Sequence, residues 1–240
     1  LWRRVLFRLL GLVSFVGVLH SRRATAVYIG LSSRYGMLID AFYIALARIY
    51  SVRVYCHHHN FSYLRAPHLS ARITMAAARR AYHVVLCEQM AVALFASFGV
   101  PRERIKVLSN SAVIDSDLAA GAPEFAADNE SEGLDALKIG FLSNITPEKG
   151  IFEFAEICRR VGALRRVSIA VAGPISGANH SAIMDTLKAL PNAVQVGSVY
   201  GTEKAKFLQN IDVLLFPTRY ANEAEPLVVL EALAAGTFVI

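Results

Sequence analysis

Cysteine is scarce in this chain of 240 residues, which contains three: Cys56, Cys87 and Cys158. They lie far apart and form no Cys-x-x-Cys pair, so the sequence indicates neither a zinc site nor a disulfide framework. We interpret them as small buried thiols in a reducing compartment. With 55% hydrophobic residues, the chain is long enough to bury one large core or two modest ones.

Several well-known motifs are also missing. The sequence contains no P-loop and no Gly-x-Gly-x-x-Gly fingerprint, the two common phosphate-binding glycine loops. It contains no Gly-x-Ser-x-Gly elbow, which disfavours a Ser-His-Asp hydrolase. No nucleic-acid recognition motif and no basic run interleaved with aromatics occurs, so we expect no nucleic-acid partner.

No long charge-free hydrophobic run occurs at the start of the chain. Residues 1–19 are apolar but include Arg3, Arg4 and Arg8, and the charge-free remainder is shorter than the roughly 20 residues that span a bilayer. We expect a crossover helix packed on a sheet; a signal-like segment and a helix in a membrane interface are the alternatives. Because the chain begins with Leu1 and stops at Ile240 in an apparent strand, we expect a fragment lacking both ends.

Negative charge is scarce in the first half of the sequence. Residues 1–110 hold 15 Lys and Arg against 3 Asp and Glu, a balance of +12, whereas residues 111–240 hold 10 against 16, a balance of −6. This asymmetry indicates that the first half faces an anionic surface or acceptor. The alternative is that the basic residues only solvate helices.

Apolar, β-branched segments alternate with helical patterns along the whole chain, which predicts parallel sheets with right-handed crossovers. In the first part, strands are predicted at Ala26–Leu31, Val52–Cys56, Val84–Cys87 and Ile105–Leu108, with helices at Met37–Tyr50 and Ala71–Arg80. In the second part, strands are predicted at Lys138–Leu142, Val167–Ala172, Ala193–Val196 and Val213–Phe216, with helices at Ile151–Val161, Ala178–Leu190 and Thr202–Leu208.

The segment between these two parts has a different composition. Residues 116–136 are rich in Ala, Gly, Asp and Glu and show no sustained apolar period, which is typical of a linker. The predicted organisation is therefore a first Rossmann-like domain at 1–115, a linker at 116–136, and a second Rossmann-like domain at 137–240. Both are α/β doubly wound parallel-sheet domains, and both are expected to be incomplete.

Two glutamates, Glu223 and Glu231, bracket a predicted helix start at the end of a buried strand. Pro226 fits the first helical position, where its missing N–H costs nothing, and Gly236 suits the C-terminal cap. A helix N-terminus offers unpaired amides and a positive dipole end to a phosphate. Carboxylates beside it accept hydrogen bonds from hydroxyls, so the pattern predicts a nucleotide-sugar site, although two solvated glutamates on an ordinary helix would have the same spacing.

The same residues carry a family resemblance. Phe216-Pro217-Thr218 through Glu223, followed by Pro226 through Gly236, resembles the donor-site signature of retaining GT-B glycosyltransferases of family 4. The usual pattern is Pro-Ser, then Glu-Gly-Phe-Gly-Leu-Val-x-Leu-Glu-Ala-Met-Ala-x-Gly. Here Ala224, Glu225 and Pro226 replace Gly-Phe-Gly. The resemblance implies that Glu223 binds the sugar as a catalytic residue and that Glu231 binds the ribose. It also implies that amides near Pro226, Leu227 and Val228 contact the donor.

A second stretch supports the resemblance. Residues Leu142 through Gly150 resemble Gly-Arg-Leu-x-x-Glu-Lys-Gly, whose Arg and Lys neutralise the donor diphosphate in the family. Lys149 is retained, and Asn144 occupies the place of the arginine. The resemblance therefore implies a donor-binding role for both, with Lys149 supplying the charge. An ordinary turn is the alternative.

Three adjacent histidines follow a predicted strand at its carboxyl end: His57, His58 and His59. Family members place a histidine near the donor sugar here, and we favour His59 as the catalytic one because a His-Asn pair is common at this point. Adjacent histidines do not easily converge on one ion, so we expect no metal and no cofactor. One or two of the three are alternatively only strand-end residues.

The predicted function is therefore a retaining glycosyltransferase that uses a nucleoside-diphosphate sugar and a carbohydrate or lipid-linked acceptor in surface polysaccharide or glycolipid assembly. A catalytically silent nucleotide-sugar-binding scaffold subunit and a GT-B-fold nucleotide-sugar epimerase are the alternatives. We expect a cytoplasmic protein, and peripheral association with the inner face of a membrane through the basic N-terminal half is a further expectation.

Overall fold

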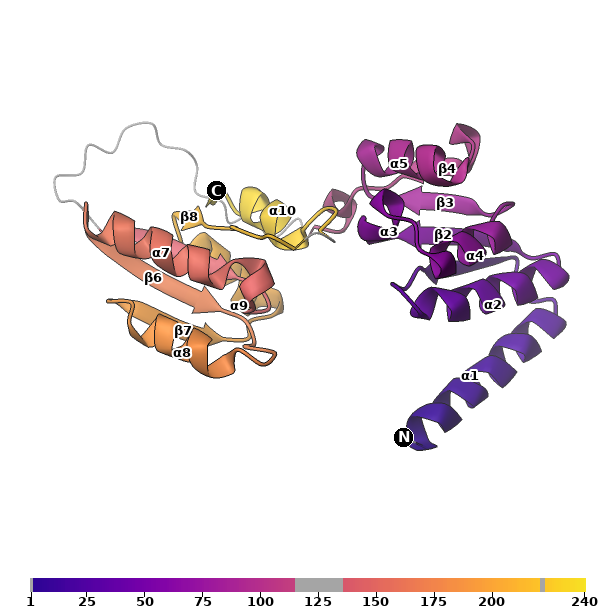
Figure 1. Ribbon diagram of the computed structural model, residues 1–240, viewed down its shortest axis with the longest axis horizontal. Coiled ribbons are helices and arrows are strands. Elements are labelled where there is room, and N and C mark those ends of the chain that lie inside the picture. The colour runs from indigo at the N-terminus through magenta and orange to yellow at the C-terminus, as the bar shows by residue number, and fades with distance from the viewer. Residues whose placement is uncertain (1, 115–135, 221–222) are drawn as a thin grey trace. The chain divides into compact units, whose positions relative to one another are not determined.

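The computed structural model describes residues 2–114, 136–220 and 223–240 (Figure 1). Except for residue 136, the predicted linker lies outside the described residues. The chain divides into two compact units: Leu1–Ser109 with Ala221–Glu225, here called unit 1, and Asn110–Tyr220 with Pro226–Ile240, here called unit 2. Each contains one parallel sheet, which confirms the predicted α/β class.

Unit 1 is built on a four-stranded parallel sheet whose order follows the sequence, β1-β2-β3-β4. Its strands are β1 (Ala26–Gly30), β2 (Arg53–His58), β3 (Tyr82–Val85) and β4 (Ile105–Val107). The connections contain α2 (Gly36–Ile49), α3 (Ser62–Arg65), α4 (Leu69–Ala77), α5 (Glu88–Phe98) and the short 3-10 helix η1 (Arg102–Arg104). Because each crossover steps in the same direction and crossovers are right-handed, α2, α4 and α5 cover the same face of the sheet.

The core of unit 1 lies between that face and those helices. Strand residues Val54, Cys56 and Val85 pack there against helix residues such as Met37 and Met90. The strand residues alternate with outward-facing neighbours, as a period of two requires. Burial raises the pKa of the Cys56 thiol to about 12, which agrees with its interpretation as a small buried side chain.

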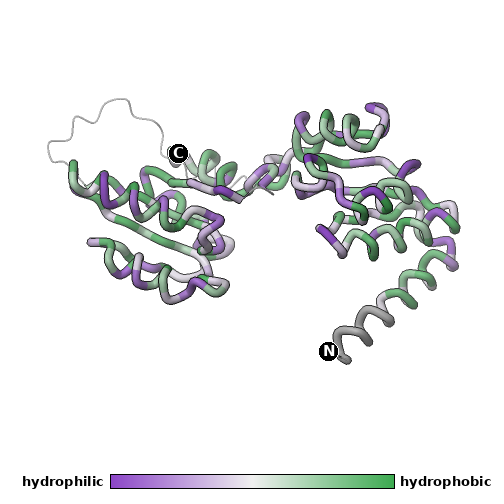
Figure 2. Tube along the Cα trace, in the orientation of Figure 1, coloured by the Kyte–Doolittle hydropathy of each residue, from purple (hydrophilic) through white to green (hydrophobic). Residues whose placement is uncertain are grey.

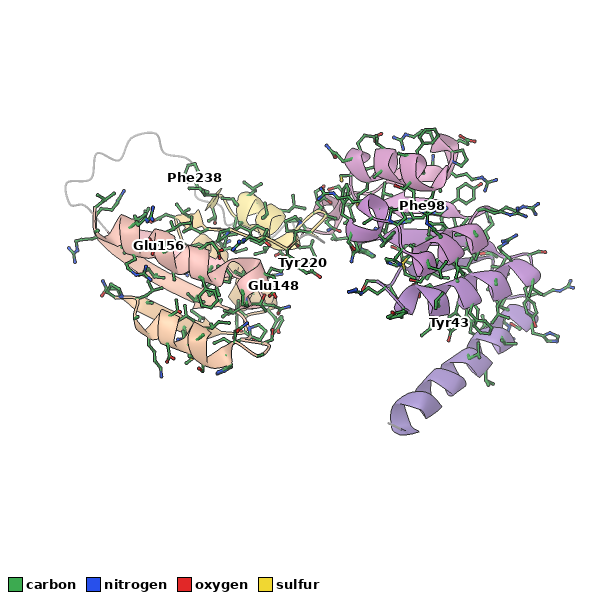
Figure 3. All side chains as sticks on the ribbon, in the orientation of Figure 1. Tyr43, Phe98, Glu148, Glu156, Tyr220 and Phe238 are labelled. Atoms are coloured by element: carbon green, nitrogen blue, oxygen red, sulfur yellow. The ribbon has the colours of Figure 1, made fainter. Side chains whose placement is uncertain are left out.

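The first segment forms helix α1 (Trp2–His20), as the sequence predicts. Phe15 of this helix contacts α2, because its ring and that of Tyr43, which is labelled in Figure 3, lie 4.9 Å apart edge to face. His20 lies near Tyr50, the residue that follows α2. We expected this helix to pack on a sheet, whereas these contacts are with a helix. None of the described helices is sufficiently long and apolar to cross a membrane.

Unit 2 is built on a five-stranded parallel sheet of order β7-β6-β5-β8-β9. The strands are β5 (Leu137–Leu142), β6 (Val167–Ala172), β7 (Ala193–Gly197), β8 (Val213–Leu214) and β9 (Phe238–Val239). The helices are α7 (Ile151–Gly162), α8 (His180–Lys188), α9 (Gly201–Gln209) and α10 (Leu227–Ala234), with short 3-10 helices η2 (Asn110–Val113) and η3 (Pro147–Lys149). The direction of winding reverses between β5 and β8, which defines a topological switch point.

Two hydrophobic clusters follow from this reversal, one on each face of the sheet. Helices α7 and α8 contribute Phe154 and Ile183 to one cluster. Helices α9 and α10 contribute Phe207 and Ala232 to the other. Unit 2 is therefore doubly wound, and its sheet is buried on both sides near β5, which explains the continuous apolar sequence of that strand.

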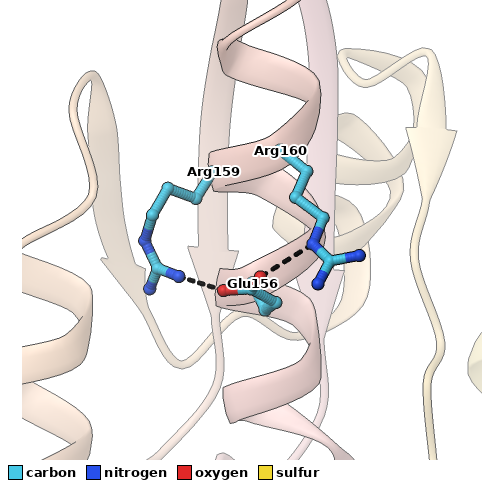
Figure 4. A network of polar contacts seen from close by, with 3 residues as sticks. All are labelled: Glu156, Arg159 and Arg160. Atoms are coloured by element: carbon cyan, nitrogen blue, oxygen red, sulfur yellow. Dashed lines mark hydrogen bonds and ion pairs between the residues drawn. The ribbon is translucent and has the colours of Figure 1, made fainter.

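Helix α7 illustrates how the sequence produces one of these layers. Its apolar residues recur at i, i+3, i+4 and i+7 and are buried: Ile151, Phe154, Ala155 and Cys158. On the outer side, Arg160 Nε donates to Glu156 Oε1 at 2.7 Å, and Arg159 also pairs with Glu156 (Figure 4). The hydrogen bond from Arg160 and the nearby Arg159 lower the pKa of Glu156. Such exposed pairs contribute little to stability, so the apolar stripe determines the position of the helix.

The predicted elements are present, but their bounds differ by up to three residues. Strand β3 begins at Tyr82 rather than Val84, and β2 extends to His58 rather than ending at Cys56. Helix α4 begins at Leu69 because His68 caps it, its Nδ1 accepting a hydrogen bond from the Ala71 amide at 3.2 Å. A histidine cap has no strong sequence signature, so the prediction began this helix two residues late.

Figure 2 shows the hydropathy of each described residue along the trace. The helices carry both apolar and polar positions, as expected for elements with one face on a sheet. The coloured part of α1, from residue 11 onward, and helix α2 are predominantly apolar in this view. Because polar positions are few, some apolar side chains of α2 remain on the surface of unit 1.

Candidate functional site

The candidate site lies at the carboxyl edge of the sheet in unit 2, where β5 and β8 are neighbours. Open α/β sheets bind ligands at such a switch point. Two loops leave the sheet here, one running from Ser143 to Gly150 and the other from Leu215 toward α10. They contact one another, because the Arg219 amide donates to the Glu148 carbonyl at 2.9 Å. The Arg219 guanidinium also pairs with Glu153 at the start of α7.

Gly150 allows the close approach of these two loops. It has a φ of +84°, in the left-handed region that glycine tolerates. A Cβ added at this position would lie 2.1 Å from the Pro217 carbonyl oxygen. Only glycine tolerates both the left-handed backbone and the close carbonyl. Gly150 therefore fixes the path of the loop after β5, here called the β5 loop, against the loop after β8, here called the β8 loop.

Lys149 is the cation of this loop. It is half-buried, and its Nζ lies 4.7 Å from the ring centre of Tyr220, a cation–π contact between the two loops. Asn144 is exposed at the same edge, and it lies in the sequence between two buried residues, Leu142 and Ile145. The two side chains provide one positive charge and one amide at this edge of the sheet.

Helix α10 begins in the same region. Its N-cap is Pro226, with φ −70° and an extended ψ of 119°. The expectation that Pro226 occupies the first helical position is therefore wrong by one residue, because its ψ is not helical. Proline has no side-chain acceptor. Within the described residues, no backbone carbonyl accepts a hydrogen bond from the amides of Leu227 and Val228. These two amides and the positive end of the helix dipole are suited to an anionic group.

The other end of α10 confirms the predicted cap. Gly236 has a φ of +79°, its amide donates to the Leu233 carbonyl at 3.1 Å, and the Thr237 amide donates to the Ala232 carbonyl at 2.9 Å. This pair of bonds is a Schellman motif. It turns the chain directly into β9, so the helix is fixed at both ends.

Glu231 lies in the second turn of α10 and has a partner that the sequence did not reveal. Lys204 Nζ of α9 lies 2.5 Å from Glu231 Oε1, and the two side chains are 30% and 12% exposed. The reversal at the switch point places α9 and α10 on the same face of the sheet, and this brings Lys204 to Glu231. Lys204 lies in an ordinary amphipathic pattern, so no sequence signal could have identified it.

The segment before α10 belongs to the other unit. Residues 221–225 cluster with unit 1. Ala224 packs against the core of unit 1, and Ser109 Oγ donates to Glu225 Oε1 at 2.8 Å. Glu223 is half-buried in the same segment. The structure therefore assigns Asn144, Lys149, Pro226, Leu227, Val228 and Glu231 to unit 2, and His59 and Glu223 to unit 1.

The three histidines have different environments. His57 and His58 belong to β2. His58 is fully buried, with the Tyr63 hydroxyl 2.7 Å from its Nδ1 and His83 Nδ1 2.9 Å from its Nε2. His59 follows the strand and is exposed beside Gly30. His58 is therefore a core residue, and His59 is the exposed one of the three.

Desolvation shifts the pKa of all three imidazoles downward, toward the neutral form. Desolvation, with a smaller contribution from His59, lowers the pKa of His57 to about 4. Burial also lowers the pKa of His58 and of His59. In its neutral form the His59 imidazole can donate a hydrogen bond to a hydroxyl through one ring nitrogen and accept one from a hydroxyl through the other. Among the described residues, no group of three or more His, Cys, Asp or Glu side chains is arranged to hold a metal ion.

Residues 122–240 match the family model described as Glycosyl transferases group 1. This region contains both loops of the switch point and all of α10. No curated protein matches the chain in sequence. The family match and the site geometry thus fall on the same half of the chain.

The solved structures that are similar to the chain include GT-B glycosyltransferases, and this similarity confirms the predicted α/β fold with two parallel sheets. The structure of HepE from Anabaena in complex with UDP-glucose is similar, with a TM-score of 0.66, 16% identity, and coverage of 94% of this chain and 62% of that one. The lipopolysaccharide outer core galactosyltransferase WaaB is similar over 100% of this chain and 62% of its own, with a TM-score of 0.62 and 16% identity.

A more distant enzyme shares the same architecture. The catalytic domain of starch synthase IV from Arabidopsis thaliana, bound to ADP and acarbose, has a TM-score of 0.65 and 11% identity, covering 95% of this chain and 58% of its own. At such identities the similarity establishes the fold. This chain spans less than two thirds of the length of each of these three proteins.

Proposed function

We propose that this chain is part of a retaining glycosyltransferase that transfers a sugar from a nucleoside-diphosphate sugar to a hydroxyl acceptor. One observation carries the proposal: Lys149 and the amides of Leu227 and Val228 follow the two strands at which the sheet order reverses. A cation and a helix N-terminus at a switch point are suited to a diphosphate. In this proposal unit 1 is the acceptor-side domain and unit 2 the donor-side domain. The predicted bounds, 1–115 and 137–240, differ from these units at residues 110–114 and 223–225.

The assigned roles follow the chemistry of each side chain. Lys149 neutralises charge on the leaving diphosphate, with Asn144 donating a neutral hydrogen bond. Glu231 accepts hydrogen bonds from the ribose, and Glu223 accepts them from the sugar. His59 hydrogen-bonds to a sugar hydroxyl near the reacting carbon. The leaving phosphate accepts the proton of the attacking hydroxyl on the same face of the sugar, so no separate protein base is required.

The acceptor is proposed to be a carbohydrate or lipid-linked intermediate of surface polysaccharide or glycolipid assembly. The support is the charge of the first part of the chain, +12 over residues 1–110. A basic surface favours anionic partners. Cytoplasmic location with peripheral attachment to a membrane would place the enzyme beside such an acceptor.

Nucleotide binding tests the donor site. The melting temperature of the intact protein is measured with UDP, ADP, GDP and CDP, because a ligand bound by the folded state alone raises it. We expect one or more to bind, and we expect Lys149→Ala and Glu231→Ala each to weaken that binding about tenfold, the effect of losing a hydrogen bond involving a charged group. The matched control is Lys188→Ala on α8, which removes a lysine that is exposed.

Two further measurements extend this test. Asn144→Arg supplies a second charge at the exposed position and should strengthen diphosphate binding. Transfer of label from the corresponding nucleotide sugar to an acceptor panel then tests the reaction itself. Unchanged binding in both Lys149→Ala and Glu231→Ala would refute the donor site.

An epimerase is the second candidate, because UDP-GlcNAc 2-epimerase from Neisseria meningitidis is also similar, with a TM-score of 0.51 and 13% identity over 85% of this chain. An epimerase would convert the nucleotide sugar without any acceptor, so an acceptor-free assay separates the two activities. A silent scaffold subunit would bind nucleotide and turn over no substrate in either assay. The replacements at Asn144 and at Ala224–Pro226 are the features that favour it.

A further inference from the structure

Helices α2 and α4 of unit 1 expose an unusual number of large apolar side chains. On α2, Leu38 and Phe42 are 41% and 50% exposed, and on α4, Leu69 and Ile73 are 73% and 44% exposed. Tyr35, just before α2, is exposed as well. We call this surface, together with Arg34 and Arg72, the α2–α4 face.

The spacing of these residues shows that they are not part of the core stripe. Met37, Ile44 and Ala47 form the buried stripe of α2, whereas Leu38 and Phe42 are four residues apart on a different side of the helix. On α4, Thr74 and Met75 are buried, while Leu69 and Ile73 repeat the outer spacing. Each helix therefore has two apolar stripes, one for the core and one that faces outward. A helix whose outer side faces water needs only the apolar stripe that packs on the core.

The two outer stripes meet in one groove. Leu38, Leu69 and Ile73 line a depression of about 390 Å³ together with Arg34 and His68. Its walls are fixed by two hydrogen bonds between the elements: Ser70 Oγ donates to the Arg34 carbonyl at 2.9 Å, and Thr74 Oγ1 donates to the Met37 carbonyl at 2.7 Å. The apolar side chains are thus held together rather than scattered.

The charges around the groove are positive. Arg34 is exposed and lines the groove, and Arg72 is exposed on α4 next to Ile73 in the sequence. The one carboxylate of α2, Asp40, is buried and accepts hydrogen bonds from the Ser32 amide and hydroxyl. Helix α4 contains no acidic residue. The α2–α4 face therefore combines apolar side chains with uncompensated cations, and its partner should be apolar and anionic.

We propose that the α2–α4 face docks on an anionic lipid bilayer. Leu38, Phe42, Leu69 and Ile73 enter the boundary between headgroups and acyl chains, and Arg34 and Arg72 bind lipid phosphates. A second copy of the chain fits less well, because a symmetric contact would bring the same arginines together. The proposal involves none of the residues assigned to donor binding, so its outcome does not depend on sugar transfer.

Vesicle sedimentation tests this proposal. The intact protein is mixed with vesicles of phosphatidylcholine alone or of phosphatidylcholine with phosphatidylglycerol. We expect binding to the anionic vesicles only, weakened by salt because the charges are exposed. The double variant Leu38→Ser with Leu69→Ser should reduce the affinity for anionic vesicles at least about tenfold, because apolar burial is lost. The double variant Arg34→Glu with Arg72→Glu should reduce that affinity about fivefold for each cation removed.

Matched controls come from other parts of the chain. Val92→Ser with Phe95→Ser removes two side chains of α5 that are 62% and 60% exposed, and Arg165→Glu reverses an exposed charge of unit 2. Both controls should bind vesicles as the unmodified protein does. Equal binding to neutral vesicles, or equal losses in the controls, would overturn the proposal. So would a dimer that Leu38→Ser with Leu69→Ser converts to monomer in size-exclusion chromatography while vesicle binding stays unchanged.

Discussion

At the scale of single residues, the Glu231 carboxylate has two partners, the observed Lys204 and a proposed ligand hydroxyl. We propose that its side chain accepts a hydrogen bond from a ligand hydroxyl, and it is already paired with Lys204 at 2.5 Å. A carboxylate that is only 12% exposed needs such a partner when no ligand is bound. Lys204 fixes one oxygen of Glu231 and so presents the other in a defined direction. We infer that Lys204 is a positioning residue.

A double-mutant cycle measures this coupling. Lys204→Met should lower the free energy of unfolding of unit 2 by about 1–3 kcal/mol, because it leaves a nearly buried carboxylate without its cation. Adding Glu231→Gln should restore part of that loss, so the two effects should not add. Urea unfolding provides the measurement. Lys206→Met, which removes an exposed lysine from the same helix, is the control and should change stability little; strictly additive effects would argue against the pair.

Among the secondary-structure elements, the loops that follow strands determine the site more than the strands do. The β5 loop passes so close to the β8 loop that the backbone of Gly150 meets that of Pro217. Gly173 after β6 is similarly close to the Ser143 carbonyl, where an added Cβ would lie 1.8 Å away. These contacts at the carboxyl edge hold Lys149 beside Tyr220.

Gly150→Ala separates steric contact from backbone strain when it is compared with Gly197→Ala. Both glycines have nearly equal φ angles, +84° and +83°, but nothing lies within 4 Å of a Cβ at Gly197. Gly197→Ala should therefore cost about 1–2 kcal/mol of unfolding free energy for the left-handed conformation alone. Gly150→Ala should cost at least about 1 kcal/mol more, because backbone atoms must also move. Equal costs in thermal or urea unfolding would show that the loops separate easily.

In the molecule as a whole, the two units differ in charge and in what they bury. Unit 1 has a polar network inside its core: His58 is hydrogen-bonded to Tyr63 and to His83, and all three are buried. Burial lowers the pKa of His83 to about 4, against an ordinary value of 6.5. Desolvation does the same for His57. Protonation of these rings therefore destabilises unit 1.

This network predicts acid sensitivity for unit 1. Unfolded histidines take up protons near pH 6.5, whereas folded His57 and His83 do so only near pH 4. The stabilisation is complete above pH 6.5 and is lost as the pH falls toward 4, by at most about 3 kcal/mol for His83. Urea unfolding at a series of pH values should show this slope, and His83→Leu should flatten it. His180→Gln, at an exposed position of α8, should leave the slope unchanged; an unchanged slope in His83→Leu would contradict this account.

The sequence predicts well what depends on neighbours along the chain. Apolar segments indicated every strand of both sheets, including β9 in the apparent strand at the end of the sequence, because local periodicity encodes burial directly. Gly236 at the end of α10 was predicted correctly, since a left-handed cap has a strong residue preference. Pro226 was placed one residue too far into the helix, because proline fixes φ and leaves ψ open.

The sequence alone therefore determined the α/β class, the order of the strands and the residues at the ends of β5 and β8, whereas helices α3 and α5 were not predicted. It could not determine which side chains meet across the sheet, because strand order and crossover direction are set by the packing of the whole unit. For that reason only the tertiary structure revealed Lys204 beside Glu231 and Tyr220 beside Lys149. It also separated the buried His58 from the exposed His59, since burial depends on the helices that cover a strand and not on the strand itself.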